Sequence, residues 1–348
     1  MEGLTAGTVA GYLVRQGWFP GIPVLAVEAL SGGVSSQVFR VRLGDGREVV
    51  VKQPLGRLRV AEEWLCDPDR ARNEAEALKR AERLLSAGMS PRLLGFGGED
   101  LCLLMEAAPR GIPTWKELLL EGDGSVELAA AAGEILGRLQ TGTWNHTELQ
   151  EVFSSGMRYF EVLRLDPYFR FLASRHSAAS FVLERVIRSL RNQGQCLVHG
   201  DFSPKNLLVT GSDRLMLIDW EVVHFGSPLF DPAFLLSHLT LKALHAGRSG
   251  QSSLEQSIRT FWQSYQSYLS RPPETGSSPS PSASRSVFAE IAPVLGALVL
   301  ARVDGKSPVD YLTPEEQEVA RAFGLFVLVD PPNDLETYLA SLKGRMVA

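Results

Sequence analysis

The sequence has few cysteines and no segment suited to a membrane. Its three cysteines, Cys66, Cys102 and Cys196, lie far apart without a CxxC or Cys/His spacing, and an odd number argues against a disulfide framework. Residues 1–17 lack the basic region followed by an apolar core that marks a signal peptide. The longest apolar run, residues 291–301, is too short to span a bilayer and is interrupted by a proline. These absences predict a cytoplasmic protein with reduced thiols and no membrane partner.

Basic side chains are also fewer than acidic ones. The chain has 35 Lys and Arg against 40 Asp and Glu, a formal net charge of -5, and no basic run long enough to follow a phosphate backbone. We therefore expect no nucleic-acid partner. The hydrophobic share of 45% and the charged share of 22% are average for globular proteins, and 348 residues suffice for two domains that each bury a core.

The first hundred residues have the pattern of strands around one helix. Gly44-Asp-Gly46 is a turn signal between two apolar runs, and residues 67–87 have a helical periodicity that ends before Gly88. The predicted strands cover residues 24–30, 38–43, 48–53, 91–97 and 101–106. This order predicts an antiparallel sheet that carries one helix.

After Pro109 the pattern changes to helices. Predicted helices cover residues 125–141, 180–194 and 313–328, another begins at Asp231, and two short strands, residues 207–209 and 215–218, flank a turn. We therefore predict an α+β fold of two lobes, a smaller one over residues 1–108 with the antiparallel sheet and a larger, mostly helical one over residues 109–348. Residues 271–286 are dominated by Ser and Pro and predict a mobile loop outside the active site.

The strongest motif is His199-Gly-Asp-Phe-Ser-Pro-Lys-Asn206, followed thirteen residues later by Asp219-Trp-Glu221. Phosphoryl transfer needs a carboxylate that receives the proton of the acceptor hydroxyl, and oxygen ligands that hold magnesium against the phosphates. Asp201, Asn206 and Asp219 supply those groups, and the flanking apolar strands would hold them rigidly.

Each of these residues alone has an ordinary structural explanation. His199 could be a buried loop histidine, Asn206 a turn residue and Asp219 a strand-end cap. Their joint occurrence at this spacing, between apolar strands and after a helix, favours a kinase site.

The segment resembles the HGDxxxxN and ID-x-E motifs of the aminoglycoside phosphotransferase and choline kinase superfamily, small-molecule kinases with a protein-kinase-like fold, and the resemblance covers nearly the whole chain. It implies that Asp201 is the catalytic base and that Asn206 and Asp219 are magnesium ligands, with ATP and Mg²⁺ as cofactors. Glu221 stands where several of these kinases carry a second acidic residue near the metal or the acceptor. The first lobe would bind nucleotide, and the second would carry the catalytic and acceptor-binding groups.

Lys52 follows three valines at a strand end and resembles the phosphate-binding lysine of this fold. A single Lys at a strand end is more often solvated. The helix that follows offers two glutamates as partners, of which Glu74 lies on the buried face, whereas Glu76 faces Arg72 and Arg80 and is explained by surface pairing. The helix phase therefore predicts a pair of Lys52 with Glu74.

Gly32, Gly33, Ser35 and Ser36 lie between the first two strands, in the place of the glycine-rich loop of the fold. Glycines let the backbone approach phosphates and the serines add hydroxyl donors, so we expect this segment to contact the nucleotide. A Gly-Gly pair between strands is first of all a turn, and the segment departs from the GxGxxG of protein kinases.

Residues 103–109 join the two predicted lobes and resemble the hinge that binds adenine through its backbone, with Glu106 and Ala108 as the contact positions. A plain connecting strand explains the same residues equally well. Asp231 precedes a proline and could cap the helix that follows, while in the fold a similar aspartate also braces the catalytic loop.

Two further features concern the acceptor side. Ser203 stands two residues after Asp201, where aminoglycoside phosphotransferases often have His. Lys205 is the basic residue of the loop that could assist the transferring phosphoryl group in place of that His. Residues 301–306 are charged and follow an apolar helix, so they either line the acceptor pocket or form a solvated loop.

We therefore predict an ATP-dependent phosphotransferase that acts on a hydroxyl of a small polar molecule of the sugar, amino alcohol or aminoglycoside type. Only nine residues separate Glu221 from Asp231, and no APE-type motif is present, which disfavours protein substrates. The alternative is a pseudokinase that binds nucleotide or a partner protein without turnover. Neither the acceptor nor the oligomeric state follows from the sequence, because one fold serves many substrates.

Overall fold

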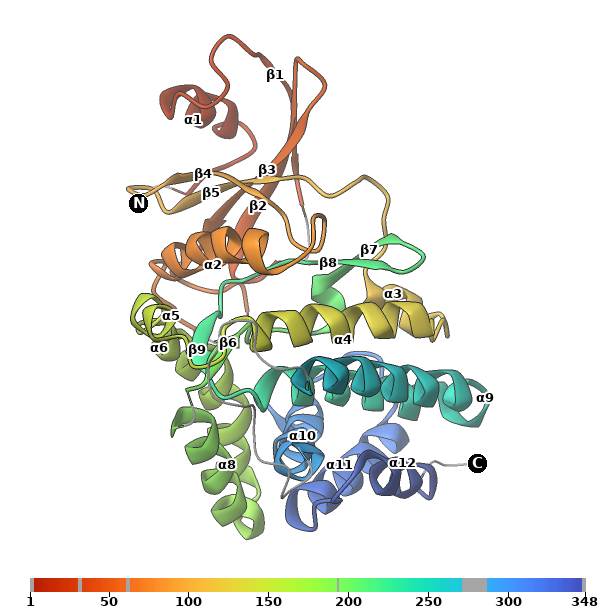
Figure 1. Cartoon of the computed structure of the whole chain (residues 1–348). Coiled ribbons are helices and arrows are strands. Elements are labelled where there is room, and N and C mark those ends of the chain that lie inside the picture. Colours follow the sequence, from red (N-terminus) through yellow and green to blue (C-terminus); the bar gives the residue numbers. More distant parts are fainter. Residues whose placement is uncertain (1–2, 31–32, 61–62, 193, 271–286, 346–348) are drawn as a thin grey trace. The chain divides into compact units, whose positions relative to one another are not determined.

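The computed structural model describes residues 3–30, 33–60, 63–192, 194–270 and 287–345 (Figure 1). The chain divides into two compact units, Met1–Arg110 with Asp219–Val222 and Gly111–Ile218 with Val223–Ala348. It therefore returns to the first unit for four residues and then leaves it again. The Ser- and Pro-rich residues 271–286, for which the sequence predicts a mobile loop, lie outside the described residues.

The first unit is built on a five-stranded antiparallel sheet, as the sequence predicts. The strand order is β1-β2-β3-β5-β4, and each neighbouring pair is antiparallel. The strands are β1 (Val24–Ala29), β2 (Ser36–Leu43), β3 (Glu48–Pro54), β4 (Leu93–Gly97) and β5 (Cys102–Glu106). The predicted turn joins β2 to β3, and Gly46 in it has a φ of 86°, which is costly for residues with a Cβ.

Alternation along the two central strands places one face of this sheet in a core. Phe39, Val41 and Leu43 on β2 and Val49 and Val51 on β3 are buried in one cluster. Successive side chains of a strand point to opposite faces, so every second residue is apolar and buried.

Helix α1 (Val9–Arg15) packs on this cluster and is absent from the sequence prediction. Val9, Tyr12 and Leu13 are its buried residues. Their spacing is that of one helix face, but seven residues are too few for such a pattern to be distinguished from a loop.

Helix α2 (Arg70–Leu84) is the predicted helix of this unit and is shorter at both ends than residues 67–87. Its buried face carries Ala71, Glu74, Ala75, Leu78 and Ala81, as the periodicity predicts. A carboxylate on a buried face needs a partner, because burying an unpaired charge is costly.

The second unit is mainly helical. Its α-helices are α3 (Trp115–Leu120), α4 (Val126–Thr141), α5 (Thr147–Val152), α6 (Gly156–Phe160), α7 (Phe171–Arg175), α8 (Ser180–Asn192), α9 (Phe230–Leu269), α10 (Val287–Asp304), α11 (Pro314–Val329) and α12 (Leu335–Lys343). A π-helical stretch, Glu161–Arg170, joins α6 to α7, and short 3₁₀ turns cover Ser177–Ala179 and Pro204–Asn206. The predicted caps are present: Ser125 Oγ accepts from the Leu128 N–H, and Thr313 and Glu316 form a capping box.

Helices α4 and α9 lie side by side in this unit (Figure 1). Gly133 on α4 permits the close approach, since a Cβ there would lie 2.6 Å from the Phe261 carbonyl oxygen. Helix α9 is interrupted at Gly247, whose φ of 58° and ψ of -160° are not helical.

Two small antiparallel sheets fasten the loop that carries the His199-to-Asn206 motif. One pairs β6 (Cys196–Val198) with β9 (His224–Gly226), and the other pairs β7 (Leu207–Gly211) with β8 (Arg214–Leu217). The sequence predicts β7 and β8 but not β6 and β9. Because β6 ends directly before the motif and β7 begins directly after it, the loop is held at both ends.

The segment 301–306 differs from the predicted charged loop. Helix α10 continues through Asp304, which is buried. Its carboxylate accepts two hydrogen bonds of 2.8 Å from Arg321 on α11 and lies 2.9 Å from His176 Nε2. These partners explain how an acidic residue can end a buried helix.

Two expectations from the composition concern the described part of the chain. No helix there is both long and apolar enough to cross a membrane. Cys66, Cys102 and Cys196 are buried and not joined in disulfides.

Candidate active site

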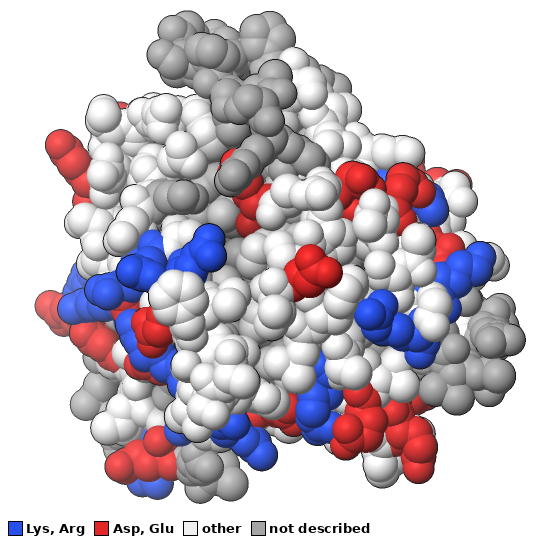
Figure 2. All heavy atoms as spheres, turned by 90° about the horizontal axis from the view of Figure 1, so that it is seen from below, with Lys and Arg blue, Asp and Glu red and all other residues white. Residues whose placement is uncertain are grey.

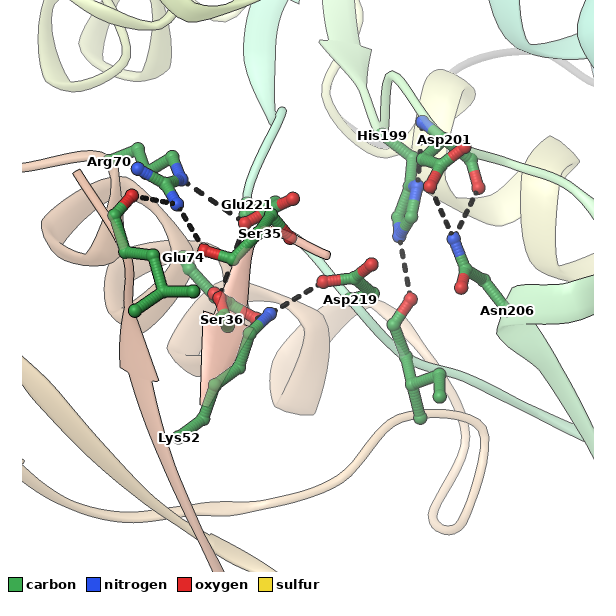
Figure 3. Close-up of polar contacts among 12 residues, drawn as sticks. Ser35, Ser36, Lys52, Arg70, Glu74, His199, Asp201, Asn206, Asp219 and Glu221 are labelled. Atoms are coloured by element: carbon green, nitrogen blue, oxygen red, sulfur yellow. Dashed lines mark hydrogen bonds and ion pairs between the residues drawn. The ribbon is translucent and has the colours of Figure 1, made fainter. Parts of the chain in front are cut away.

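In the first unit, Lys52 lies between two carboxylates (Figure 3). Its Nζ donates to Glu74 Oε1 at 2.7 Å and to Asp219 Oδ1 at 2.5 Å. Lys52 comes from β3 and Glu74 from the buried face of α2, and both are at least 95% buried. The pair that the helix phase predicts is therefore present.

The electrostatics of this cluster follow from burial and close charges. Burial works against a charged Lys52, but the carboxylates of Asp219 and Glu74 outweigh it and raise its pKa above the ordinary value. Burial, together with Asp219 and Glu221, raises the pKa of Glu74 to about 7, while Lys52 acts in the opposite direction. Lys52 is thus held as a cation among three acidic groups.

Glu76 lies on the outer face of α2. It pairs with Arg80 at 3.0 Å, as predicted, and with Lys79 at 3.4 Å. The predicted contact with Arg72 is wrong, since Arg72 pairs with Asp69 one turn earlier. Glu76 is therefore a suitable control for Glu74 on the same helix.

Glu74→Gln is expected to weaken productive nucleotide binding about as much as Lys52→Met, because either change removes the buried pair. The double variant should be little worse than either single one, since coupled residues are not additive. Glu76→Gln should hardly change turnover or melting temperature, because exposed pairs on a helix contribute only about 0.3–0.5 kcal/mol. ATP turnover of the four variants under one set of conditions decides, and an impaired Glu76→Gln beside a healthy Glu74→Gln would overturn the assignment.

A second buried ion pair in this unit links Arg70 to Glu221. Arg70 Nε donates to Glu221 Oε2 at 3.1 Å, and its Nη2 donates to the Ser35 carbonyl at 2.6 Å (Figure 3). Arg70 is fully buried. Ser36 Oγ makes a longer contact of 3.5 Å with the same Glu221 oxygen. The arginine thus ties the serine-containing loop to the Asp219-Trp-Glu221 segment.

Arg70 belongs to no motif of the sequence. It stands one turn before Glu74 on the buried face of α2, so the periodicity that identified the glutamate also contained the arginine. Of the predicted phosphate-loop residues, Ser35 and Ser36 are buried, Gly33 lies beside them in the chain, and Gly32 lies outside the described residues.

Asp219 has an unusual backbone conformation. Its φ of 69° is in the left-handed region, which residues other than glycine adopt at a cost, although Asp tolerates it better than most. Strained backbone of this kind is concentrated at functional sites. The observation supports a functional role for this carboxylate.

In the second unit, the Asp201 carboxylate accepts from several donors, of which Figure 3 draws Asn206. Asn206 Nδ2 donates to Asp201 Oδ2 at 2.8 Å, and Lys205 Nζ lies 2.9 Å from the same oxygen. Arg164 Nη2 lies 3.0 Å from Asp201 Oδ1, and Arg164 Nε donates to the Gly200 carbonyl at 2.7 Å. These contacts fix the orientation of the carboxylate. Arg164 comes from the π-helical stretch, where no sequence motif marked it.

Asp231 braces the same loop from α9. Its two carboxylate oxygens accept from the backbone N–H groups of His199, at 2.7 Å, and Gly200, at 2.9 Å. Asp231 does not cap α9, because the helix already begins at Phe230 and the carboxylate is used by the loop. The alternative role of a brace is the one observed.

Asp231→Ala should destabilise the protein by about 2–6 kcal/mol, since two buried N–H groups lose their acceptor at roughly 1–3 kcal/mol each. Chemical denaturation monitored by circular dichroism measures this change. Ser125→Ala, which removes an ordinary helix cap, is the control and should cost about 1 kcal/mol. Equal effects of the two variants would contradict a special role of Asp231.

The remaining residues of the loop are arranged by its neighbours. His199 Nε2 lies 3.2 Å from the Ile218 carbonyl oxygen, and the Ile218 N–H donates to the Asn206 carbonyl at 3.0 Å. Ser203, two residues after Asp201, is fully buried, and its Oγ has no hydrogen-bond partner among the described residues. Lys205 therefore contacts Asp201 where Ser203 does not.

The segment predicted as the adenine hinge, residues 103–109, contains most of β5 and continues past the end of that strand. Glu106 is its final residue, and the Glu106 N–H donates to the Arg92 carbonyl at 2.9 Å. Ala108 lies beyond the strand and is partly buried. The geometry agrees with a connecting strand end and leaves the adenine contact a prediction.

Asn206 of the second unit and Asp219 of the first unit each carry an oxygen of the kind that magnesium prefers. Asn206 uses its amide nitrogen to hold Asp201, so the ligand atom of this side chain is Oδ1, and Asp219 contributes a carboxylate. Within the described ranges no three or more His, Cys, Asp or Glu side chains form a cluster that could hold a metal. Magnesium commonly takes one or two protein oxygens and completes its shell with phosphate oxygens and water, so each of these side chains is chemically suited to ligate it.

A sheet unit with a buried Lys-Glu pair and a helical unit with an Asp-Asn loop define the class of protein as a phosphotransferase. The family model described as the phosphotransferase enzyme family, APH, matches residues 26–259. The chain belongs to this family.

Several solved structures of phosphotransferases are similar to this chain. The aminoglycoside phosphotransferase APH(4)-Ia is 16% identical over 97% of this chain and 99% of that chain, with a TM-score of 0.50. The streptomycin-ATP ternary complex of APH(2″)-IIa is 16% identical over 98% and 99%, with a TM-score of 0.48. Macrolide 2′-phosphotransferase MphH from Brachybacterium faecium is 16% identical over 96% and 97%, also with a TM-score of 0.48. The similarity to APH(4)-Ia, together with the family match, confirms the predicted α+β, protein-kinase-like fold.

Proposed function

We propose that this phosphotransferase moves the γ-phosphoryl group of ATP to a hydroxyl of a small molecule. The observation that carries the proposal is the Asp201 carboxylate, oriented by Asn206, Lys205 and Arg164 in a loop fastened by two small sheets. A buried, oriented carboxylate in a phosphotransferase is the group that accepts the proton of the attacking hydroxyl.

The other predicted residues have supporting roles in this proposal. Lys52, held by Glu74, would bind phosphate oxygens of the nucleotide. Asn206 and Asp219 would ligate magnesium, which when bound neutralises charge on the phosphates. The loop at Gly33, Ser35 and Ser36 would cover the phosphates, and the backbone at Glu106 and Ala108 would contact adenine.

The role that we propose for Glu221 differs from the one expected from the sequence. The sequence suggested a place near a second metal or the acceptor, but its carboxylate is paired with the buried Arg70. We propose that its first task is to hold the loop at Ser35, because Arg70 donates to that loop with another of its nitrogens.

The test is whether MgATP raises the melting temperature of the protein and is slowly hydrolysed. A small rise with measurable hydrolysis supports the proposal, because many kinases transfer the phosphoryl group to water when no acceptor is present. Stabilisation by MgATP with no turnover, with or without an acceptor, would favour a pseudokinase.

The unbridged cysteines and the net charge of -5 support a cytoplasmic location and the absence of a nucleic-acid partner as further parts of the proposal.

A further inference from the structure

A cavity of about 220 Å³ in the second unit begins at the catalytic loop. The loop contributes Pro204 and Lys205 to its wall, α9 contributes His238 and Lys242, and α10 contributes Arg302. The remaining wall is formed by Lys116 of α3 and by residues 308–311. Lys205 Nζ lies 2.9 Å from Asp201 Oδ2, so a residue that lines the cavity also contacts the proposed catalytic base.

The wall carries an excess of positive charge. Four of its side chains are cationic, Lys116, Lys205, Lys242 and Arg302, whereas Asp310 is its single carboxylate. Asp310 is mostly exposed and lies 3.8 Å from Lys116 Nζ. On the face of the molecule drawn in Figure 2, by contrast, the described Lys and Arg side chains are interspersed with Asp and Glu.

Lys242 is the most unusual of these residues. It is 1% exposed, and its Nζ has no hydrogen-bond partner among the described residues. The nearest aromatic ring is that of Tyr311, with 5.2 Å between Nζ and the ring centre. A buried ammonium without a partner is costly, and a bound anion would offset that cost.

Two other polar atoms of the wall lack partners in the described residues. They are Arg302 Nε and the Tyr311 hydroxyl, both buried. The opposite end of Arg302 is engaged, since its Nη1 donates to Ser307. Three residues of the cavity wall therefore each carry a buried donor group that no described residue satisfies.

The pKa shifts agree with a positive potential in the cavity. Burial, with Lys116 and Arg302, lowers the pKa of Lys242 to about 7, and Asp310 opposes this change. Burial, with Arg302 and Lys242, lowers the pKa of His238 well below its ordinary value, so His238 is neutral at pH 7. A bound anion would act in the opposite direction and raise the pKa of both groups.

We propose that the acceptor of this enzyme is a small hydroxylated anion, whose acidic group is held in this cavity by Lys242, Arg302 and Lys116 while its hydroxyl reaches Asp201. The inference rests on the proposed phosphotransferase function and names the acceptor class. Pockets that bury drug-sized ligands measure roughly 300–1,000 Å³, so this cavity suits a compact molecule. Amino alcohols and aminoglycosides carry positive charge, which the four cations would repel.

The first experiment is a phosphate-transfer screen with matched acceptors. The panel contains hydroxycarboxylates of three to six carbons, sugar phosphates, the neutral amides and free sugars that correspond to them, and amino alcohols with aminoglycosides. Transfer to a carboxylate or to a sugar phosphate, with at least about a tenfold drop in kcat/KM for its neutral counterpart, supports the proposal and identifies the kind of anion. Preferred transfer to a neutral or cationic acceptor overturns it and leaves the phosphotransferase function intact.

The second experiment measures anion binding without turnover. Malonate and inorganic phosphate, in the absence of magnesium and nucleotide, should raise the melting temperature of the wild-type protein more than that of Lys242→Met. Lys242→Met should fold, because methionine fills a similar volume without a buried charge. Lys79→Met removes an exposed lysine from α2 and is the matched control, with wild-type behaviour expected. Equal anion responses of wild type and Lys242→Met, or anion binding that ATP abolishes, would overturn the proposal.

The third readout is the pH dependence of that binding. Lys242 is charged below its pKa of about 7 and neutral above it. Malonate affinity should therefore fall on the order of tenfold between pH 6 and pH 9 in the wild type, and by much less in Lys242→Met. The charged or titratable groups that face Lys242 are Lys116, Lys205, His238, Arg302, Asp310 and Tyr311. A pH dependence that survives in Lys242→Met would assign the effect to one of these groups and overturn the role of Lys242.

Discussion

Asp201→Asn is expected to lower turnover by a factor on the order of 100 or more, the range of lost general-base catalysis, while nucleotide binding remains nearly intact. The amide has the shape of the carboxylate, and its oxygen can still accept from Arg164. It cannot take up the proton of an attacking hydroxyl. The effect should therefore be found in kcat and not in the KM for ATP.

The control for this variant is Asp213→Asn. Asp213 is an exposed aspartate in the turn between β7 and β8, seven residues after the catalytic loop, and contacts only Arg214 among the ion pairs, at 4.0 Å. It should keep wild-type turnover. Turnover of Asp201→Asn near that of the wild type, with any acceptor that the wild type phosphorylates, would show that Asp201 is not the base.

Asp219→Ala is expected to abolish magnesium-dependent nucleotide binding while binding without metal survives. Its proposed role is to ligate the metal and not to contact adenine, and oxygen ligands of Mg²⁺ cannot be replaced by a methyl group. Calorimetric titration with ATP, with and without magnesium, measures the difference. Lys52 also loses the nearer of its two carboxylates, so the affinity for ATP alone should rise or stay unchanged.

The comparison for Asp219→Ala is Glu221→Gln. Glutamine keeps an oxygen for Arg70, so the loop at Ser35 stays tied, and magnesium dependence should persist. Wild-type MgATP binding by Asp219→Ala would exclude its role as a ligand. Loss of magnesium dependence in Glu221→Gln would instead return Glu221 to the metal site.

Local patterns predicted much of the fold and the pair of Lys52 with Glu74 in the candidate site. The sheet followed from alternation and turn glycines, and the choice of Glu74 over Glu76 followed from the phase of α2, which the ion pairs confirm. Both predictions depend only on residues that are close together in the chain. The roles of these residues in catalysis remain predictions.

Features that depend on distant parts of the chain could not be predicted in this way. Arg164 reaches Asp201 from an irregular π-helical stretch 37 positions earlier in the numbering, and no motif links the two. Asp231 has the local sequence of a helix cap, yet tertiary contacts with the loop use its carboxylate instead. Lys242 looks like an ordinary lysine of a long helix until the packing around it shows that it is buried.

The return of residues 219–222 to the first unit has a consequence for how this protein can be divided. A fragment that ends at Arg110 would contain the whole five-stranded sheet but would lack Asp219 and Glu221. Lys52 and Arg70 would then be left inside it with fewer counter-charges than they have in the intact chain. The two units are therefore not interchangeable modules, because the sheet unit takes two of the carboxylates that pair with its buried cations, Asp219 and Glu221, from a stretch more than a hundred residues later in the chain.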